Sequence, residues 1–261
     1  DVCSSDLLTA ALDSTNQPGA TSELWRETSR IGCAQVQNDW IQCTPWNNPK
    51  EKGMGIGWTF AQSGAAEYGL WVATDGKRFV NELANRKVRA DAIMVLKGEG
   101  KSAVAICTKP NLKAFEEARP GMLQKLLEQQ IIKEYKSLDE IAADYKMPVD
   151  TLKATVAEFN KAVETKSDPA FGRYINNEQT PLAEGPWYAA EMSPKVHHCM
   201  GGLVTDLQCR VIDVVDGKPV PGLFAAGEAT GGVHGAVRLG SCAILDCLVN
   251  GRIAGQQAVK A

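Results

Sequence analysis

The stretch that decides the fold spans residues 222–240 and reads GLFAAGEATGGVHGAVRLG. It opens on a short apolar strand and holds six glycines in nineteen residues, which let the backbone come close to a flat, polar partner. A helix is expected to begin at Cys242, and a helix start offers N–H groups and a positive dipole end to an anion. A tight strand-to-helix connection without a ligand is the alternative, but the glycines and the lone Arg238 favour a binding segment.

Two further segments carry residue types that commonly bind or react with substrates. Residues 196–202 read VHHCMGG, and residues 76–86 read GKRFVNELANR. Taken alone, each histidine is more often a structural hydrogen-bonding group than a catalyst, and Arg86 is more often a salt-bridging side chain. The three segments together indicate a site.

The bulk composition is that of an ordinary globular chain. Its 261 residues are 44% hydrophobic and 23% charged, with a formal net charge of −3, which is enough length for one large or two modest domains. Basic residues are scattered, so we expect no nucleic-acid partner. No apolar run approaches the roughly 18 residues of a membrane span, and we expect none in this chain.

The eight cysteines show no pattern of a metal or haem site. They are not arranged as Cys-x-x-Cys, and their spacing is not that of zinc ligands. We therefore expect no metal, and we interpret the cysteines as small buried hydrophobes or free thiols, which suits a reducing setting.

The first residues do not look like the start of a gene product. The chain begins Asp1-Val2-Cys3 without a methionine, and we expect that the N-terminus is missing and that residues 1–7 are artefactual adapter read-through. The compartment therefore stays open between bacterial cytoplasm and periplasm.

Periodicity and turn residues predict the following order of elements: a helix over residues 22–31, a strand over 34–43, an irregular loop over 43–57, a hairpin over 69–80, a helix over 88–97, a buried strand over 103–107, three helical patterns up to Lys166, short apolar strands after Trp187, and a last helix over 242–258. The hairpin is expected to turn at Asp75-Gly76, and Gly251 and Gly255 are expected to let another element pack closely on the last helix.

All three quoted segments resemble the flavoprotein subunits and flavocytochromes of the fumarate reductase family, which includes urocanate and acrylate-type reductases. The resemblance covers roughly Ser22 to Ala261 and is strongest from Gly222 to Gly255. It implies an FAD-dependent oxidoreductase acting on CH–CH groups, with a small carboxylic acid as substrate. It also allows for an electron-donor protein or domain that carries haem or reduced flavin.

The implied fold class is α/β plus α+β. Residues 1–57 would be the C-terminal part of the first FAD-domain segment, residues 58–185 an inserted α+β capping domain, and residues 186–261 the second FAD-domain segment with the substrate clamp and last helix. The Rossmann-like flavin domain would be partial, because no Gly-x-Gly-x-x-Gly turn precedes Ser22. The chain alone is therefore expected to bind flavin poorly or not at all.

The resemblance also implies roles for single residues. His198 and Arg238 match the pair that grips a substrate carboxylate, for which a planar guanidinium is suited. Arg86 matches the proton donor, so the implied catalytic residues are Arg86, His198 and Arg238. The implied reaction is hydride transfer from flavin N5 to the β carbon of an α,β-unsaturated carboxylate, with Arg86 delivering a proton to the α carbon.

Other matched positions surround these three. Glu228 matches the residue that hydrogen-bonds the flavin ribityl chain, while Ala243 and Ile244 match backbone positions at the helix start that face the flavin C2 oxygen. Ser241 stands where the family has a substrate-contacting glycine. Thr59 matches a substrate-binding threonine, and Thr44 stands at a substrate-binding position next to Pro45.

The chain departs from the family pattern in its expected pocket wall. Thr44 replaces a histidine, and Phe60 and Ser63 replace a glutamate and an arginine that would relay protons. Burying a second carboxylate without a cation there would cost several kcal/mol. We therefore expect a monocarboxylic enoate as substrate over fumarate.

Two other interpretations stay open. The chain could be a non-catalytic fragment that lacks the cofactor-binding half, or it could come from a related flavin dehydrogenase that runs the reaction in the oxidative direction. Retention of His198, Arg238 and Arg86 together favours a working site in the parent protein.

Overall fold

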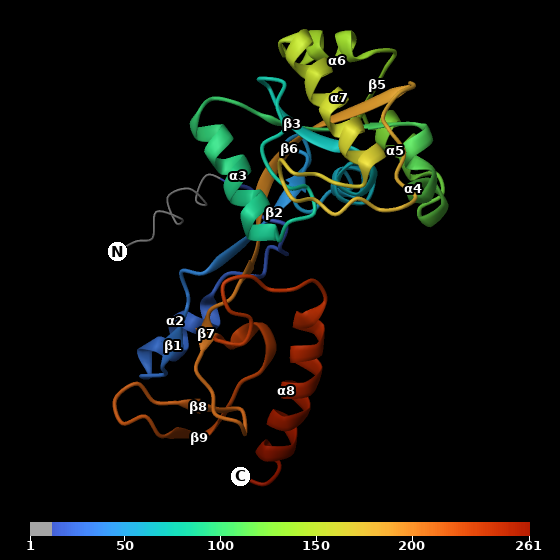
Figure 1. Ribbon diagram of the computed structural model, residues 1–261. Coiled ribbons are helices and arrows are strands. Elements are labelled where there is room, and N and C mark those ends of the chain that lie inside the picture. Colours follow the sequence, from blue (N-terminus) through green and yellow to red (C-terminus); the bar gives the residue numbers. More distant parts are fainter. Residues whose placement is uncertain (1–11) are drawn as a thin grey trace. The chain divides into compact units, whose positions relative to one another are not determined.

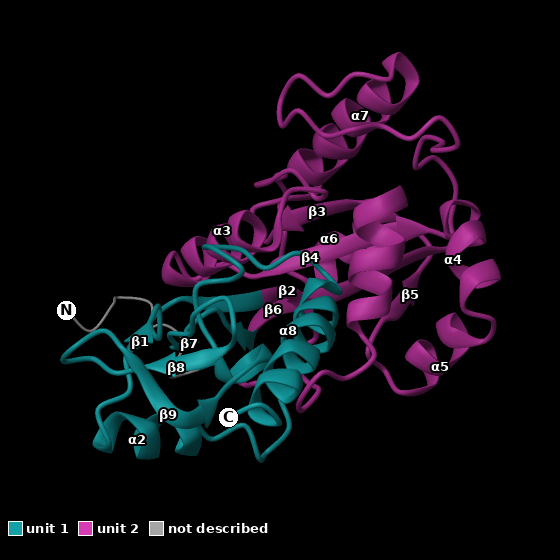
Figure 2. Cartoon of the chain, turned by 90° about the horizontal axis from the view of Figure 1, so that it is seen from below, with its two compact units in different colours: residues 1–12, 16–43, 196–261 teal, residues 13–15, 44–195 magenta. Residues whose placement is uncertain are grey.

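The computed structural model describes residues 12–261, so the expected artefact at residues 1–7 lies outside the described residues. These residues form two compact units (Figure 2). Unit 1 comprises Leu12, Asn16–Cys43 and Val196–Ala261, and unit 2 comprises Asp13–Thr15 and Thr44–Lys195. The predicted capping domain, residues 58–185, lies within unit 2.

The chain passes from unit 1 into unit 2 within strand β2 (Ile41–Asn47) and returns within strand β6 (Trp187–Cys199). The remaining elements of unit 2 are η1 (Thr59–Ala66), β3 (Leu70–Ala73), α3 (Arg86–Gly98), β4 (Ala103–Thr108), η2 (Pro110–Leu112), α4 (Lys113–Ala118), α5 (Met122–Glu128), β5 (Lys133–Tyr135), α6 (Leu138–Asp144) and α7 (Val149–Thr165) (Figure 1).

The sheet of unit 2 has the strand order β2-β6-β4-β3, and β5 also pairs with β6. Every residue of β4 is buried, because apolar helices cover both faces of this strand. One face packs on η1, α3 and α5, and the other packs on α6 and α7. The predicted buried strand at residues 103–107 is thus confirmed.

Local capping explains where two of these helices begin. The side chain of Asn85 accepts a hydrogen bond from the Val88 N–H at the start of α3, and Ser137 accepts one from the Glu140 N–H at the start of α6. Side chains of this kind satisfy N–H groups that a helix start leaves open. The helix predicted over 88–97 is confirmed, with its first turn at Arg86.

Unit 1 contains α2 (Glu23–Arg30), β1 (Gln35–Val36), β7 (Gly202–Leu203), β8 (Arg210–Ile212), β9 (Pro219–Phe224), η3 (Gly227–Ala229) and α8 (Cys242–Ala258). Helix α8 lies beside β9 and η3. The approach is close at Gly227, which has a φ of +65° and where an added Cβ would lie 2.6 Å from the Cys247 Sγ. Only glycine fits this turn, as the glycine-rich stretch predicts.

Three predicted elements differ in the structure. The strand expected over 34–43 is split by a turn in which Gln37 has a φ of +56°, and its second part, β2, continues to Asn47 into the expected loop. The prediction of a second strand in the 69–80 hairpin is wrong. The turn forms at Gly76, but after it only Arg78 forms a β-bridge, with Val72. Arg78 is instead held by carboxylates, as described below.

Strand β6 is thirteen residues long, where short strands were expected. It pairs with β2, β4 and β5. The first half of the strand, residues 187–192, contributes side chains to the apolar clusters on both faces of the sheet.

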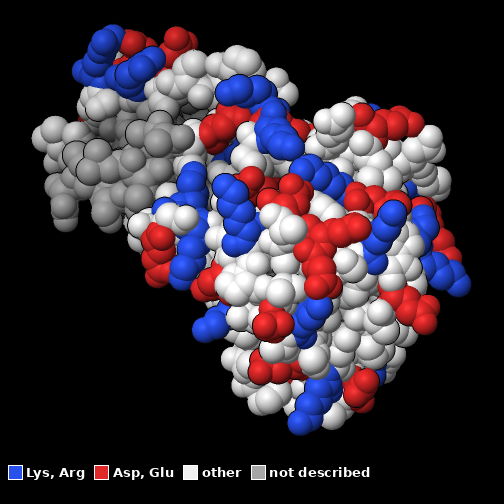
Figure 3. All heavy atoms as spheres, turned by 90° about the horizontal axis from the view of Figure 1, so that it is seen from above, with Lys and Arg blue, Asp and Glu red and all other residues white. Residues whose placement is uncertain are grey.

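Charges are interspersed on the surface. Lysines, arginines and acidic side chains alternate over the face drawn in Figure 3, and neither sign forms a continuous stripe there. Within residues 12–261, no helix combines the length and apolar character that a bilayer crossing requires, and all seven cysteines of that range are free thiols.

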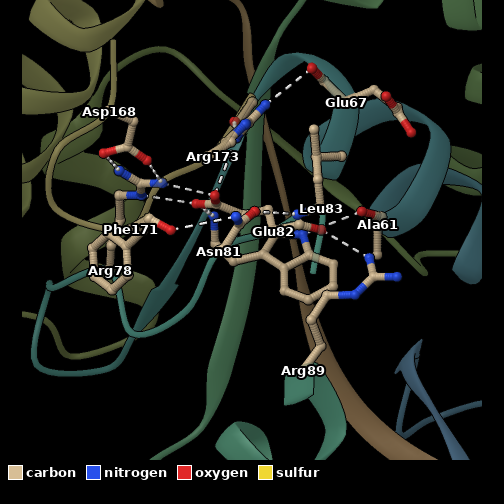
Figure 4. A network of polar contacts seen from close by, with 12 residues as sticks. Ala61, Glu67, Arg78, Asn81, Glu82, Leu83, Arg89, Asp168, Phe171 and Arg173 are labelled. Carbon is tan, nitrogen blue, oxygen red and sulfur yellow. Dashed lines mark hydrogen bonds and ion pairs between the residues drawn. The ribbon is translucent and has the colours of Figure 1, made fainter. Parts of the chain in front are cut away.

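A buried carboxylate, that of Glu82, forms ion pairs with two arginines in the interior of unit 2 (Figure 4). Glu82 is fully buried and accepts hydrogen bonds from the Arg78 Nε at 2.9 Å and Nη2 at 2.8 Å, and it forms an ion pair with Arg173 at 3.2 Å. Arg78 also donates to both carboxylate oxygens of Asp168, at 3.2 and 2.8 Å. The network joins the 76–86 segment to the loop that follows α7.

We expect Glu82→Gln to destabilise the protein strongly, because two buried guanidinium groups would lose their shared counter-charge. Breaking a buried ion pair from one side costs about 3–5 kcal/mol. Urea unfolding of the intact protein measures this loss. The control is Asp91→Asn, which removes only the exposed pair with Lys87 and should change the free energy of unfolding by less than about 1 kcal/mol. Equal effects of the two variants would contradict this role of Glu82.

The pH dependence of unfolding should carry a signature of Asp168. Burial acts to raise the pKa of Asp168, but the hydrogen bonds and charge of Arg78 outweigh it and hold the pKa below its ordinary value. A depressed carboxyl pKa contributes stability that is present above about pH 4 and is lost as the pH falls through the folded-state pKa. In Asp168→Asn, the fall in unfolding free energy below pH 4 should be shallower. An unchanged pH profile would contradict the assignment.

Candidate functional site

A cavity of about 370 Å³ in unit 1 gathers the residues expected to hold substrate and flavin. Its walls include His198 at the end of β6, Glu228 in η3, Arg238 before α8, and Ala243 and Ile244 in the first turn of α8. The cavity therefore brings together five predicted residues from two separate stretches of sequence, and it contains no residue of the 76–86 segment.

Arg238 is a buried cation in this cavity. Only 7% of the residue is exposed, and its Nη1 donates to the carbonyl of Leu239 at 3.2 Å. Its buried Nε has no hydrogen-bond partner among residues 12–261, and no carboxylate within that range forms an ion pair with it. Burial lowers the pKa of Arg238, while the charges of Cys242 and Glu228 act in the opposite direction. A planar guanidinium in this state is prepared for an anion.

The backbone of Arg238 is fixed by unit 1 itself. The Nε2 of Gln42, which is buried, donates to the Arg238 carbonyl at 2.8 Å. Gln42 lies on β2, almost two hundred residues earlier in the chain. The position of the guanidinium therefore depends on long-range packing and not on the 222–240 segment alone.

His198 is held against a second histidine. Its ring lies edge-on to that of His234, with ring centres 5.4 Å apart, and only 8% of His198 is exposed. The His234 Nε2 lies 3.6 Å from the Asp246 Oδ2 on α8, and Asp246 in turn accepts a hydrogen bond from the Asn250 Nδ2 at 2.5 Å. Asp246 therefore lies beside the His234 ring, which in turn packs against His198.

His234 and Asp246 also line the cavity, and the sequence reasoning gave neither of them a role. His234 was part of the quoted glycine-rich stretch, and Asp246 is the only acidic residue of α8. A search for polar residues one helical turn after the expected helix start would have found Asp246.

The first turn of α8 contains the backbone positions that the resemblance implies for flavin contacts. Ser241 precedes the helix with a φ of +66°, a left-handed conformation that favours glycine. The Ile244 N–H donates to the Ser241 carbonyl at 3.1 Å, while the Ile244 side chain is 66% exposed.

The close packing expected at Gly251 and Gly255 is absent from the described residues. A Cβ added at either position would meet no atom of residues 12–261 within 4 Å. Leu245, Leu248 and Val249 on the same helix are also exposed. Helix α8 therefore presents an uncovered apolar face in the described part of the chain.

The other predicted substrate residues lie in unit 2. The hydroxyl of Thr44 is fully buried and donates to the Asn47 Oδ1. The hydroxyl of Thr59 donates to the Ile56 carbonyl at 2.7 Å, and only 3% of the residue is exposed. Both hydroxyls are thus engaged within unit 2.

Arg86 begins α3 and is half-buried. Its guanidinium carbon lies 5.2 Å from the centre of the Trp46 ring, a distance at which a cation and an aromatic face attract each other. Phe60, in η1, is fully buried in the apolar core, and Ser63 is half-buried in the same helix. Neither Phe60 nor Ser63 offers a titratable group.

The whole length of the chain is similar to known flavoproteins. A family model described as "FAD binding domain" matches residues 6–244. The acrylate reductase flavoprotein subunit of Shewanella woodyi is 35% identical over 97% of this chain and 50% of that protein. A fumarate reductase (cytochrome) of Shewanella frigidimarina is 36% identical over 95% of this chain and 41% of that protein. The chain spans about half the length of the curated relatives it matches.

Solved structures agree on the fold. An open conformation of a flavocytochrome c3 fumarate reductase matches with a TM-score of 0.71 and 31% identity, covering 99% of this chain and 43% of that one. A 3-ketosteroid delta1-dehydrogenase from Sterolibacterium denitrificans matches with a TM-score of 0.73 at 22% identity, covering 96% of this chain and 49% of that one, and supports the fold alone.

The cavity with its buried arginine, the mixed α/β fold and the match over residues 6–244 agree with one another. The chain therefore belongs to the FAD binding domain family, whose cofactor is FAD.

Proposed function

We propose that the chain is part of an FAD-dependent reductase that saturates the C=C bond of an α,β-unsaturated carboxylate. The observation that carries this proposal is the buried Arg238 guanidinium, which faces a cavity without a carboxylate partner among the described residues. Acrylate and fumarate, which the names of the similar reductases give, are both α,β-unsaturated carboxylates.

Arg238 and His198 would hold the substrate carboxylate. A bidentate contact with Arg238 would satisfy its Nε and offset the cost of burying its charge. As the C=C bond is reduced, negative charge builds up on the carboxylate side as an enolate. Cationic groups already fixed around that carboxylate stabilise this charge most in the transition state.

Arg86 is proposed as the proton donor to the α carbon, a role that rests on the sequence resemblance. Bound FAD would supply the hydride from its N5 to the β carbon. An arginine usually holds its proton up to a pH above about 12, so its neighbours have to favour proton release.

The residues around the start of α8 fit the flavin-facing half of an FAD site. Glu228, Ala243 and Ile244 would contact it, and the N-terminal end of α8 would favour a negatively charged flavin oxygen. We propose that the rest of a dinucleotide-binding domain covers the apolar face of α8, since a patch of exposed leucines and valines usually marks a contact surface. Electrons would come from a partner protein or domain that carries haem or reduced flavin.

We propose a monocarboxylic substrate in preference to fumarate. The Thr44 hydroxyl is committed to Asn47, and Phe60 is buried in the apolar core. Neither residue offers a cation to a second carboxylate, which would cost several kcal/mol to desolvate unpaired.

We expect Arg238→Met to abolish carboxylate binding without loss of bound flavin. The value of kcat/KM should fall by at least about a hundredfold, equivalent to about 3 kcal/mol of lost charge pairing. Arg238→Lys should recover only part of it, because an ammonium does not form the bidentate contact. Oxidation of a reduced viologen dye by the intact protein measures this. The control is Arg252→Met, since Arg252 is an exposed arginine on the neighbouring helix α8. An Arg238→Met enzyme as active as the wild type would contradict the proposal.

Substrate choice gives a separate test. The intact enzyme should turn over acrylate-like or cinnamate-like acids with a kcat/KM at least tenfold above that for fumarate, if an unpaired second carboxylate costs more than about 1.4 kcal/mol. A clear preference for fumarate would refute the monocarboxylate assignment and leave the reductase assignment in place.

A further inference from the structure

A second buried cation lies on the same side of α3 as Arg86. Arg89 is 5% exposed and follows Arg86 by three residues, which places the two Cβ atoms about 5–6 Å apart on one helix face. The Arg89 guanidinium carbon lies 4.6 Å from the centre of the Trp46 ring, the same ring that Arg86 contacts. Two positive charges therefore share one aromatic surface.

Arg89 is held firmly but without a counter-charge (Figure 4). Its Nη1 donates to the Gln62 Oε1 at 2.7 Å and to the Glu82 carbonyl at 2.8 Å. Its buried Nε has no hydrogen-bond partner among residues 12–261, and no carboxylate in that range forms an ion pair with it. The Glu82 carboxylate is instead taken by Arg78 and Arg173.

A buried charge without an ion-pair partner is costly, and such groups gather at functional sites. Burial and then the charge of Arg86 lower the pKa of Arg89 to about 10, while Glu67 and Glu82 act in the opposite direction. Coulomb repulsion acts equally on both partners. The positive charge of Arg89 thus favours proton release from Arg86.

We propose that Arg89 is a positioning residue that makes Arg86 a better proton donor, because its buried, uncompensated charge opposes that of Arg86 across one turn of α3. This role rests on the proposed function. One N–H proton of the Arg86 guanidinium goes to the substrate α carbon, Arg86 is left neutral, and it regains a proton from solvent. Arg89 keeps its own proton throughout. The charge of Arg89 thereby makes Arg86 more acidic. Phe60 and Ser63, which stand at the expected proton-relay positions, carry no titratable group that could do so.

Two variants remove the effect of this charge in different ways. Arg89→Gln deletes the positive charge. Gln62→Glu is nearly isosteric and places a carboxylate next to the Arg89 Nη1, which offsets the positive charge. Arg89→Lys keeps the charge. Arg119→Gln is the matched control, because Arg119 contacts a different ring, that of Trp58, at 5.6 Å.

The first readout does not need turnover. Phenylglyoxal reacts with the neutral guanidine, so its rate at Arg86, followed by peptide mapping of the intact protein, reports how readily Arg86 releases a proton. We expect this rate to fall roughly tenfold in Arg89→Gln and in Gln62→Glu, the order of magnitude expected for one charge acting on its neighbour at a partly buried site. Arg89→Lys and Arg119→Gln should stay near the wild-type rate.

The second readout is steady-state reduction of acrylate. In the two charge-removing variants, kcat should fall about tenfold with KM unchanged, in line with a weaker general acid. The alkaline limb of the kcat profile should move to higher pH, which a purely structural role would not produce. Gln62→Glu keeps the test valid if Arg89→Gln fails to fold.

The outcomes separate the two proposals. Unchanged Arg86 modification in Gln62→Glu would overturn the role of Arg89 even if the wild type reduces acrylate. Slowed modification together with a wild type that reduces no enoate would overturn the proposed function and support only the electrostatic pairing. Equal losses in Arg89→Lys and Arg89→Gln, with a raised KM, would assign Arg89 to packing and overturn the inference.

Discussion

The buried carboxylate of Glu82 is the interaction on which the interior of unit 2 depends. It pairs with Arg78 and Arg173, and Asp168 also pairs with Arg78. The backbone carbonyl of Glu82 accepts a hydrogen bond from Arg89. The Glu82 carboxylate forms its ion pairs with Arg78 and Arg173 and not with Arg89, although its charge still acts to raise the pKa of Arg89. Glu82 therefore contributes both to the stability of unit 2 and to the electrostatics around Arg89.

Arg238 in unit 1 is a second buried cation, and it forms no ion pair with a carboxylate of residues 12–261. Its carbonyl accepts a hydrogen bond from Gln42, and the His198 ring beside the cavity packs edge-on against His234. The buried Nε of Arg238 has no hydrogen-bond partner among the described residues, which is a cost unless an anion binds there. The proposed chemistry begins with the binding of an anionic substrate to the buried positive charge of Arg238.

Much of the site was predictable from the sequence because glycine and turn chemistry act locally. The turn at Gly76 and the start of α8 follow from neighbouring residues, and Gly227 combines a local positive φ with the close approach of Cys247 on α8. The FAD family assignment also follows from those stretches. The roles of the individual site residues, Arg238 and His198 as well as Arg86, and the boundaries of the capping domain stay predictions.

The rest depends on contacts distant in the sequence. The residues of η1 gave no clear helical pattern, since this helix is buried on almost all sides. The strand expected after Gly76 did not form because Arg78 is drawn to Glu82 and Asp168, and Asp168 lies ninety residues away. That Arg89 has no ion-pair partner among the described residues likewise follows only from the three-dimensional positions of the carboxylates around it.

The most direct test of the central claim is a titration of the intact, flavin-loaded protein with propionate, a saturated monocarboxylate that is not reduced. We expect a saturable change in the flavin absorption spectrum that is lost in Arg238→Met and kept in Arg252→Met. A spectrum that does not respond to propionate, or a response that survives in Arg238→Met, would contradict the claim that Arg238 holds the substrate carboxylate beside the flavin.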